Sequence, residues 1–253
     1  MLDFLKKLVS GSEEEIHELS DFSSLAVDLH SHLIPGIDDG SKSMTDTIEI
    51  LKAFKSLGYK KIITTPHVIR DSYDNSTETL LAGKEKVLEA MKKEGIDIGF
   101  DVSAEYYMDE TMYARIESKD FLPFGKNYIL VELSYLEKMN NTLDLIYKLQ
   151  VAGYRVILAH PERYPFYYEK DFKTYKSFKD RSVYFQLNMG SLVGKYGNGA
   201  KTVAQRMVDE EIVDFIASDL HTIKTIDVLK DCLKDRHTQK VIKSGMLLNK
   251  SLL

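Results

Sequence analysis

The chain has a single cysteine among its 253 residues, so no disulfide can form within it. A lone cysteine, Cys232, is typical of a protein from a reducing compartment, and we expect a cytoplasmic location. No apolar run approaches the roughly 20 residues that a membrane helix needs. The N-terminal residues also have no secretory core. We therefore expect no stable membrane insertion and no signal peptide.

Basic residues are too few and too scattered for a nucleic-acid surface. The chain has 34 Lys and Arg against 39 Asp and Glu, which gives a formal net charge of -5. Binding to a duplex needs a basic stripe, and no long block of Lys or Arg is present. We expect no nucleic-acid partner. With 43% hydrophobic and 29% charged residues, the composition is that of an ordinary globular protein.

No Pro- or Ser-rich linker divides the chain, which favours a single domain. Residues 1–24 hold an apolar patch followed by acidic residues, and we interpret them as an N-terminal extension docked on the domain. A partner-binding or membrane-surface segment is the alternative. Residues 25–253 form the predicted domain.

Seven short apolar or β-branched runs predict strands at 25–29, 61–65, 98–103, 128–133, 155–159, 182–187 and 212–217. Segments of helical period lie between them. Ser43 is a predicted helix cap, and three of the helices are predicted to end at Gly58, Gly95 and Gly153. This alternation with short joins predicts parallel strands in a barrel-like α/β sheet.

Two predicted helix faces can be compared directly with a structure. Leu143, Ile146 and Tyr147 recur at helical spacing, and we expect them to share one buried face. The second predicted face consists of Val203, Ala204, Met207 and Val208.

Histidines and carboxylates gather at the ends of the predicted strands. Successive members from Asp39 to His160 are 27 to 38 residues apart, close to the roughly 30 residues of one βαβ unit. In a parallel barrel the carboxyl ends of all strands meet on one face, so these side chains should converge. The set is His30, His32, Asp39, His67, Glu105, Glu132, His160, Asp219 and His221.

Five imidazoles and four carboxylates cannot share one pocket without cations, because burial and like charges would oppose it. Nine ligands exceed one tetrahedral zinc and suit two or three divalent ions. Nitrogen and oxygen ligands without a thiolate fit Mn, Fe or Zn. Four carboxylates and three divalent ions leave a net charge of +2, which would attract a phosphate. Each residue alone is more often structural, but the whole pattern argues against coincidence.

The chain resembles the polymerase-and-histidinol-phosphatase (PHP) superfamily. The resemblance is carried by Asp28-Leu29-His30-Ser31-His32, with Thr65-Pro66-His67, Ala159-His160-Pro161-Glu162-Arg163 and Ser218-Asp219-Leu220-His221. Within it, the chain is similar to the manganese-dependent bacterial protein-tyrosine phosphatases of capsule and exopolysaccharide synthesis. This implies a distorted TIM-like (β/α)7 barrel with the nine residues as metal ligands. Manganese is the expected metal, with Fe, Zn or Mg possible.

The resemblance also implies a reaction and a partner. A cognate bacterial tyrosine kinase would be the substrate, with a metal-bound hydroxide attacking phosphorus. Arg163 matches the phosphate-binding arginine of the family, and His67 and Asp219 are the other catalytic candidates. The oligomeric state stays open.

One position departs from the family pattern. Where a second phosphate-contacting arginine often follows the last histidine, this chain has Ile226, with Lys224 nearby. Arg70 could substitute or could form a surface salt bridge. Tyr164 could contact the ring of a phosphotyrosine or simply pack its loop.

Three other functions remain as alternatives. A related phosphoesterase could act on a small monoester such as histidinol phosphate. A nuclease or proofreading module is disfavoured by the acidic balance. A non-catalytic protein that binds the kinase is disfavoured by the complete ligand set.

Overall fold

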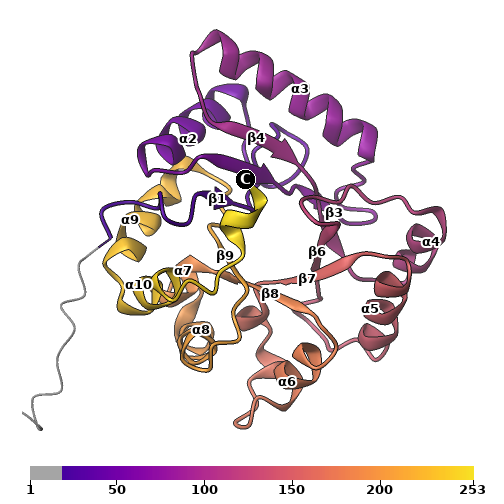
Figure 1. Cartoon of the computed structure of the whole chain (residues 1–253). Helices are drawn as coiled ribbons and strands as arrows, with labels where there is room; N and C mark the ends of the chain where they lie inside the picture. Colours follow the sequence, from indigo (N-terminus) through magenta and orange to yellow (C-terminus); the bar gives the residue numbers. More distant parts are fainter. Residues whose placement is uncertain (1–18) are drawn as a thin grey trace, which may run out of the picture.

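The computed structural model describes residues 19–253, with parallel strands in the middle and helices around them (Figure 1). The strands are β1 (Val27–Asp28), β2 (Lys61–Thr64), β3 (His67–Val68), β4 (Gly99–Val102), β5 (Glu105–Tyr107), β6 (Tyr128–Glu132), β7 (Arg155–Ala159), β8 (Tyr184–Asn188) and β9 (Phe215–Ala217). The longer helices are α2 (Met44–Ser56), α3 (Thr77–Lys93), α4 (Thr111–Ser118), α5 (Thr142–Val151), α6 (Lys173–Lys179), α8 (Gly197–Asp209), α9 (Ile226–Lys234) and α10 (Arg236–Lys243). The short α7 (Met189–Leu192) follows β8 directly.

All seven predicted strands are present, but they form two parallel sheets instead of one. One sheet has the order β1-β2-β4 and the other β3-β5-β6-β7-β8-β9. The short β3 and β5, which were not predicted, follow β2 and β4 after breaks of two residues. Pro66 lies in the first break, where a residue without an N–H cannot continue a ladder. An isolated parallel bridge joins Ser31, after β1, to Leu220, after β9.

The strands divide the core into two apolar clusters. Within β6, Ile129 and Val131 belong to the larger cluster, which includes the buried faces of the helices. Leu130 points to the opposite side and packs with a smaller cluster that includes Ile157 and Phe215. Successive side chains of a strand point to opposite faces, so both sides of β6 are buried.

The residues predicted to begin and end several helices do so in the structure. The Ser43 side chain accepts a hydrogen bond from the N–H of Asp46 at the start of α2. Gly58, Gly95 and Gly153 all have positive φ, between 64° and 96°, which a residue without Cβ adopts at little cost. The predicted apolar face of α8 is buried throughout.

The predicted face of α5 was wrong. Leu143 and Tyr147 are 39% and 65% exposed, whereas Leu145, Ile146 and Leu149 are buried. The helix is short and apolar on more than one side, so spacing alone did not determine which side meets the strands.

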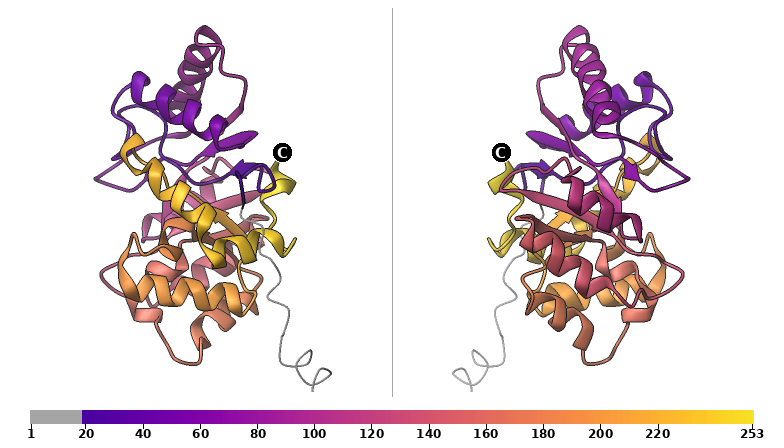
Figure 2. Two further views of the ribbon diagram at one scale, coloured as in Figure 1. Left: turned by 90° about the vertical axis from the view of Figure 1, so that its left-hand side faces the viewer. Right: turned by 90° about the vertical axis from the view of Figure 1, so that its right-hand side faces the viewer.

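Part of the proposed N-terminal extension packs on the domain. Residues 1–18 lie outside the described residues. Phe22 is fully buried against Tyr59, and its N–H donates to the carbonyl oxygen of Leu57. The boundary at residue 24 remains a prediction. Across residues 19–253, each helix is too short or too polar to cross a bilayer. Two side views show the helices on the outside of the strands (Figure 2).

Candidate metal centre

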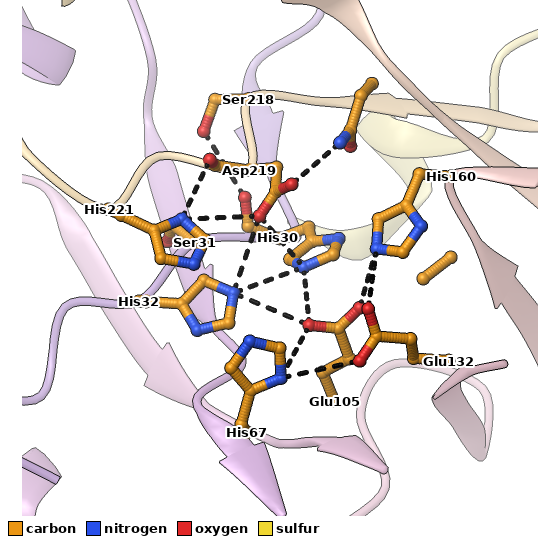
Figure 3. A network of polar contacts seen from close by, with 12 residues as sticks. His30, Ser31, His32, His67, Glu105, Glu132, His160, Ser218, Asp219 and His221 are labelled. Atoms are coloured by element: carbon orange, nitrogen blue, oxygen red, sulfur yellow. Dashed lines mark hydrogen bonds and ion pairs between the residues drawn. The ribbon is translucent and has the colours of Figure 1, made fainter. Parts of the chain in front are cut away.

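The nine side chains of the predicted ligand set converge at one end of the strands (Figure 3 labels eight of them). They follow β1, β7 and β9, begin β3 and β5, or end β6. Parallel strands bring these ends together, although the residues span almost 200 positions of the sequence. They divide into four overlapping groups whose nitrogen and oxygen atoms lie within 4.8 Å of one another. The groups are His32, Asp39, His67 and His221; His30, His32 and Glu105; His30, His160 and Asp219; and His67, Glu105 and Glu132.

Two residues of the set have a backbone conformation that residues other than glycine rarely adopt. His160 has φ 33° and Asp219 has φ 49°, both in the left-handed region. Such a conformation costs roughly 1–3 kcal/mol for a residue other than glycine. It is retained at the ends of β7 and β9, where both side chains turn into the cluster (Figure 3).

Glu105 lies at the middle of the cluster. Its Oε1 is 2.9 Å from Nε2 of His160. Its Oε2 is 3.1 Å from Nε2 of His30 and 3.2 Å from Nδ1 of His67. The two oxygens of this one carboxylate therefore lie next to imidazoles that come from three different strand ends.

Two histidines are oriented by partners behind the cluster. The Gln186 amide donates to Asn188 (2.9 Å), so its oxygen faces Nδ1 of His30 at 2.7 Å. Nδ1 of His32 is 2.7 Å from the Asp38 carboxylate. Both Nδ1 atoms therefore carry a proton, and both Nε2 atoms face the cluster. Asp38 and Gln186 had no assigned role in the sequence because their partners are known only from the fold.

The inward Nε2 atoms fit a cation. Nε2 of His30 and Nε2 of His32 lie 3.3 Å apart, close to the carboxylates of Glu105 and Asp219. Although burial opposes it, these carboxylates raise the pKa of His30 to about 9, and the pKa of His32 is also raised well above its ordinary value. A divalent ion between the same nitrogens and carboxylates would take the place of the protons that this arrangement favours. His67 Nδ1 is also buried without a hydrogen-bond partner. Five imidazoles and four carboxylates without a thiolate form a donor set that fits divalent ions. The residues therefore fit the metals expected from the sequence.

The carboxylates of the cluster differ in their electrostatic environment. Burial, together with the neighbouring Glu105, raises the pKa of Glu132 well above its ordinary value. Asp39 is half-exposed, and its interaction with His221 lowers its pKa to about 2. Repulsion between buried carboxylates is the electrostatic problem that a bound cation removes.

Arg163 is held at the edge of the cluster. Its guanidinium donates to Oδ2 of Asp219 at 2.9 Å. Its Cζ lies 4.2 Å from the ring centroid of Tyr196 and 4.9 Å from that of Tyr135. Asn188 donates to the same Asp219 oxygen at 2.7 Å, whereas Oδ1 of Asp219 is 3.4 Å from His30. Asp219 thus links the arginine to the histidine cluster.

A cavity of about 250 Å³ opens over these groups. Besides seven of the nine residues it is lined by Tyr135, Arg163, Lys195, Tyr196, Thr222 and Thr225. The sequence analysis did not identify three of these as site residues: Tyr135, Lys195 and Tyr196. For Lys195 and Tyr196, the Gly-Lys-Tyr-Gly turn soon after a predicted strand could have indicated a position near the site.

Two predicted substrate contacts lie elsewhere. Arg70 is more than half exposed, pairs with Asp71, and lines a neighbouring cavity that contains none of the nine residues. Tyr164 is fully buried, and its hydroxyl bonds within the core to Ala159 and Leu133. The chain turns Tyr164 inward immediately after Arg163, and Tyr135 lies beside the arginine instead.

Cys232 is buried in α9, and burial raises the pKa of its thiol. A nucleophilic cysteine needs the opposite, a lowered pKa in an accessible site. Cys232 therefore lacks the environment of a nucleophilic cysteine.

Glu162, next to Arg163, is a buried acid with incomplete hydrogen bonding. Its Oε1 accepts from the N–H of Asn188 (3.1 Å) and the hydroxyl of Ser191 (2.6 Å), while Oε2 has no partner. Burial is the main cause that raises its pKa from 4.5 to about 7. The protonated form is therefore favoured by folding.

This raised pKa predicts a pH-dependent stability. Between pH 4.5 and 7 the unfolded chain releases the Glu162 proton before the folded chain does, so the free energy of unfolding should fall as pH rises. Glu162→Gln should flatten that slope, by an amount on the order of 2–3 kcal/mol across the interval. Urea unfolding at several pH values measures it. Equal slopes in both proteins would show that Glu162 does not titrate there.

Comparisons with known proteins place this chain among related sequences. The family model described as "Capsular polysaccharide synthesis, CpsB/CapC" matches residues 26–244. The putative tyrosine-protein phosphatase CapC of Staphylococcus aureus is 29% identical over 212 residues, 83% of each chain. The tyrosine-protein phosphatase YwqE of Bacillus subtilis is 28% identical over 217 residues, 85% of this chain and 82% of that one.

Solved structures include a similar protein. A structure reported for YwqE of Bacillus subtilis and CpsB of Streptococcus pneumoniae, described as unique metal-dependent tyrosine phosphatases, superposes with a TM-score of 0.76. It is 27% identical and covers 89% of this chain and 90% of that one. A phosphotriesterase homology protein of Escherichia coli shares only the fold, with a TM-score of 0.52, 13% identity, and coverage of 90% of this chain and 95% of that one. The resemblance expected from the sequence is confirmed, and the chain belongs to the CpsB/CapC family of capsular polysaccharide synthesis.

Proposed function

We propose that this chain is a metal-dependent protein-tyrosine phosphatase. The observation that carries the proposal is the pair of Nε2 atoms, of His30 and His32, that lie 3.3 Å apart among the carboxylates of Glu105 and Asp219, next to a cavity lined by Arg163. Divalent cations fit the first feature, and an anion fits the second. The relatives named as tyrosine-protein phosphatases support the choice of substrate.

Two or three divalent ions, with manganese the expected metal, would be held by the nine residues in the four groups described above. Bound there, they would supply Lewis-acid charge and lower the pKa of a coordinated water. Glu105 and His67 would keep the ions close together, because each belongs to two of the groups. Gln186 and Asp38 would fix the orientation of His30 and His32.

Arg163 would bind the phosphoryl group. One edge of its guanidinium is engaged by Asp219, and the Tyr135 and Tyr196 rings restrict its rotation. A planar fork with free donors matches two oxygens of a phosphate. Because the Arg163 guanidinium is already oriented, it would lose little conformational entropy on binding the phosphoryl group. It would then stabilise the negative charge that develops on these oxygens.

The proposed physiological substrate is a phosphorylated bacterial tyrosine kinase of capsule or exopolysaccharide synthesis. A phenol with a pKa near 10 leaves more readily than an alkyl alcohol, so strong general-acid assistance is not required. A kinase with a cytosolic tyrosine-rich tail would place this chain in the cytoplasm.

We further propose that the two sheets are parts of one distorted TIM-like (β/α)7 barrel, with β3 continuing β2 and β5 continuing β4. The bridge between Ser31 and Leu220 supports this. Two backbone hydrogen bonds also support it: the Asp219 N–H donates to the carbonyl oxygen of His30 (2.9 Å), and the His32 N–H donates to that of Leu220 (3.0 Å). These contacts join the first strand to the last.

Hydrolysis assays on metal-stripped protein test the function. We expect loss of activity on a phosphotyrosine peptide after chelation and recovery with Mn, compared with Zn and Mg. A phosphoserine peptide and histidinol phosphate serve as controls. If metal binds but only histidinol phosphate is cleaved, the site stands and the substrate is a small monoester. If no phosphate ester is cleaved with any metal, the proposal fails.

A further inference from the structure

The cavity over the metal ligands contains two cationic side chains, and only one has an acidic partner. Arg163 pairs with Asp219. Lys195 lines the same cavity, and within residues 19–253 its ammonium group makes no ion pair and no hydrogen bond. A cation that faces a cavity without a counter-ion is positioned to receive an anion.

One aromatic ring holds both cations. Arg163 Cζ lies 4.2 Å and Lys195 Nζ 4.9 Å from the ring centroid of Tyr196. The Tyr196 hydroxyl donates to Oδ2 of Asp219 at 3.3 Å, which ties the ring to the ligand cluster. The position of Lys195 is therefore set relative to Arg163 and to the proposed metals.

The backbone folds Lys195 back toward the end of β8. Its N–H donates to the carbonyl oxygen of Gly190 at 2.9 Å. A methyl group at Gly190 would lie only 3.0 Å from Cδ and 3.4 Å from Cβ of Lys195. The aliphatic part of Lys195 thus packs over Gly190. This glycine is two residues after Asn188, whose side-chain amide donates a hydrogen bond to Asp219.

The loop after β9 contributes no cation to this cavity. Its lining residues beyond His221 are Thr222 and Thr225. Lys224 lies between them but does not line the cavity. Arg70, considered for this role in the sequence, lines a different cavity. Among the described residues, Lys195 is therefore the second basic side chain at the site.

We propose that Lys195 binds the phosphoryl group of the substrate together with Arg163. The inference rests on the proposed function, since it assigns a second contact to the same phosphate. A phosphate monoester carries close to two negative charges at neutral pH. One donor of Arg163 is engaged by Asp219, and Lys195 offers a second cationic donor at the same cavity. Lys195 would act as a point charge on an oxygen that the fork of Arg163 does not reach.

The direct test is the binding of inorganic phosphate to the manganese-loaded protein, measured by isothermal titration calorimetry. Lys195→Ala should raise the Kd about tenfold or more, because a charge-assisted hydrogen bond is lost. Lys195→Arg should recover most of the affinity. Lys224→Ala is the matched control and should bind as wild type. Metal content and thermal midpoint are measured for each protein.

The same variants are then assayed on a phosphotyrosine peptide. A contact formed in the bound substrate predicts a raised KM in Lys195→Ala, with a smaller change in kcat. An unchanged phosphate Kd in Lys195→Ala would overturn the inference, as would a wild-type protein that binds no phosphate. If phosphate binding depends on Lys195 but no phosphotyrosine is hydrolysed, the inference stands and the proposed function fails.

Discussion

Glu105→Gln is expected to lower kcat for a phosphotyrosine peptide on the order of a thousandfold and to remove at least one metal ion per chain. The two oxygens of Glu105 lie within 3.2 Å of nitrogens from His30, His67 and His160. The amide keeps the size of the side chain but removes its charge, and its NH₂ group cannot coordinate a cation. Loss of partners behind a metal site already costs 10–100-fold, so loss of a shared ligand should cost more. Kinetics and metal analysis by mass spectrometry measure both effects.

Glu117→Gln is the matched control for this variant. Glu117 is an exposed carboxylate on α4, outside the four ligand groups. It should leave activity and metal content unchanged. If Glu105→Gln kept full metal content and full kcat, the assignment of the cluster as a metal centre would be wrong.

Arg163→Ala should lower kcat/KM by about 10²–10³ while the metal content stays that of wild type. The guanidinium contacts the cluster only through Oδ2 of Asp219, and Asn188 continues to donate to that oxygen after the change. Arg163→Lys should recover only part of the activity, because one ammonium cannot reproduce a planar fork. Steady-state kinetics on a phosphotyrosine peptide give the result.

Arg181→Ala provides the comparison for a lost arginine. Arg181 is exposed, and its guanidinium hydrogen-bonds only to Ser177. Its removal should not change kcat/KM. Wild-type kinetics in Arg163→Ala would exclude the proposed phosphate contact, and a parallel loss of metal would show that Arg163 supports the ligands instead.

The sequence alone was enough to predict the seven main strands and the residues that meet at their ends. Strand signals are local, and a repeat close to one βαβ unit places residues such as His67 and His160 on the same edge of parallel strands. The remaining ligand candidates follow the first and last predicted strands, and the structure brings all nine side chains together. Helix caps such as Ser43 were equally predictable, because a capping residue acts within one turn.

Only the tertiary structure decided what surrounds those residues. The break at Pro66 divides the strands into two sheets, and α5 buries Leu145 and Leu149 instead of Leu143 and Tyr147. Tyr135, Lys195 and Asp38 reach the site from three different loops, with contacts that no local spacing encodes. The recurrence of histidines and carboxylates at strand ends, by contrast, is visible in the sequence itself. The second cation beside Arg163 depends on how a turn after β8 packs against the end of β9, and that is determined by the fold as a whole.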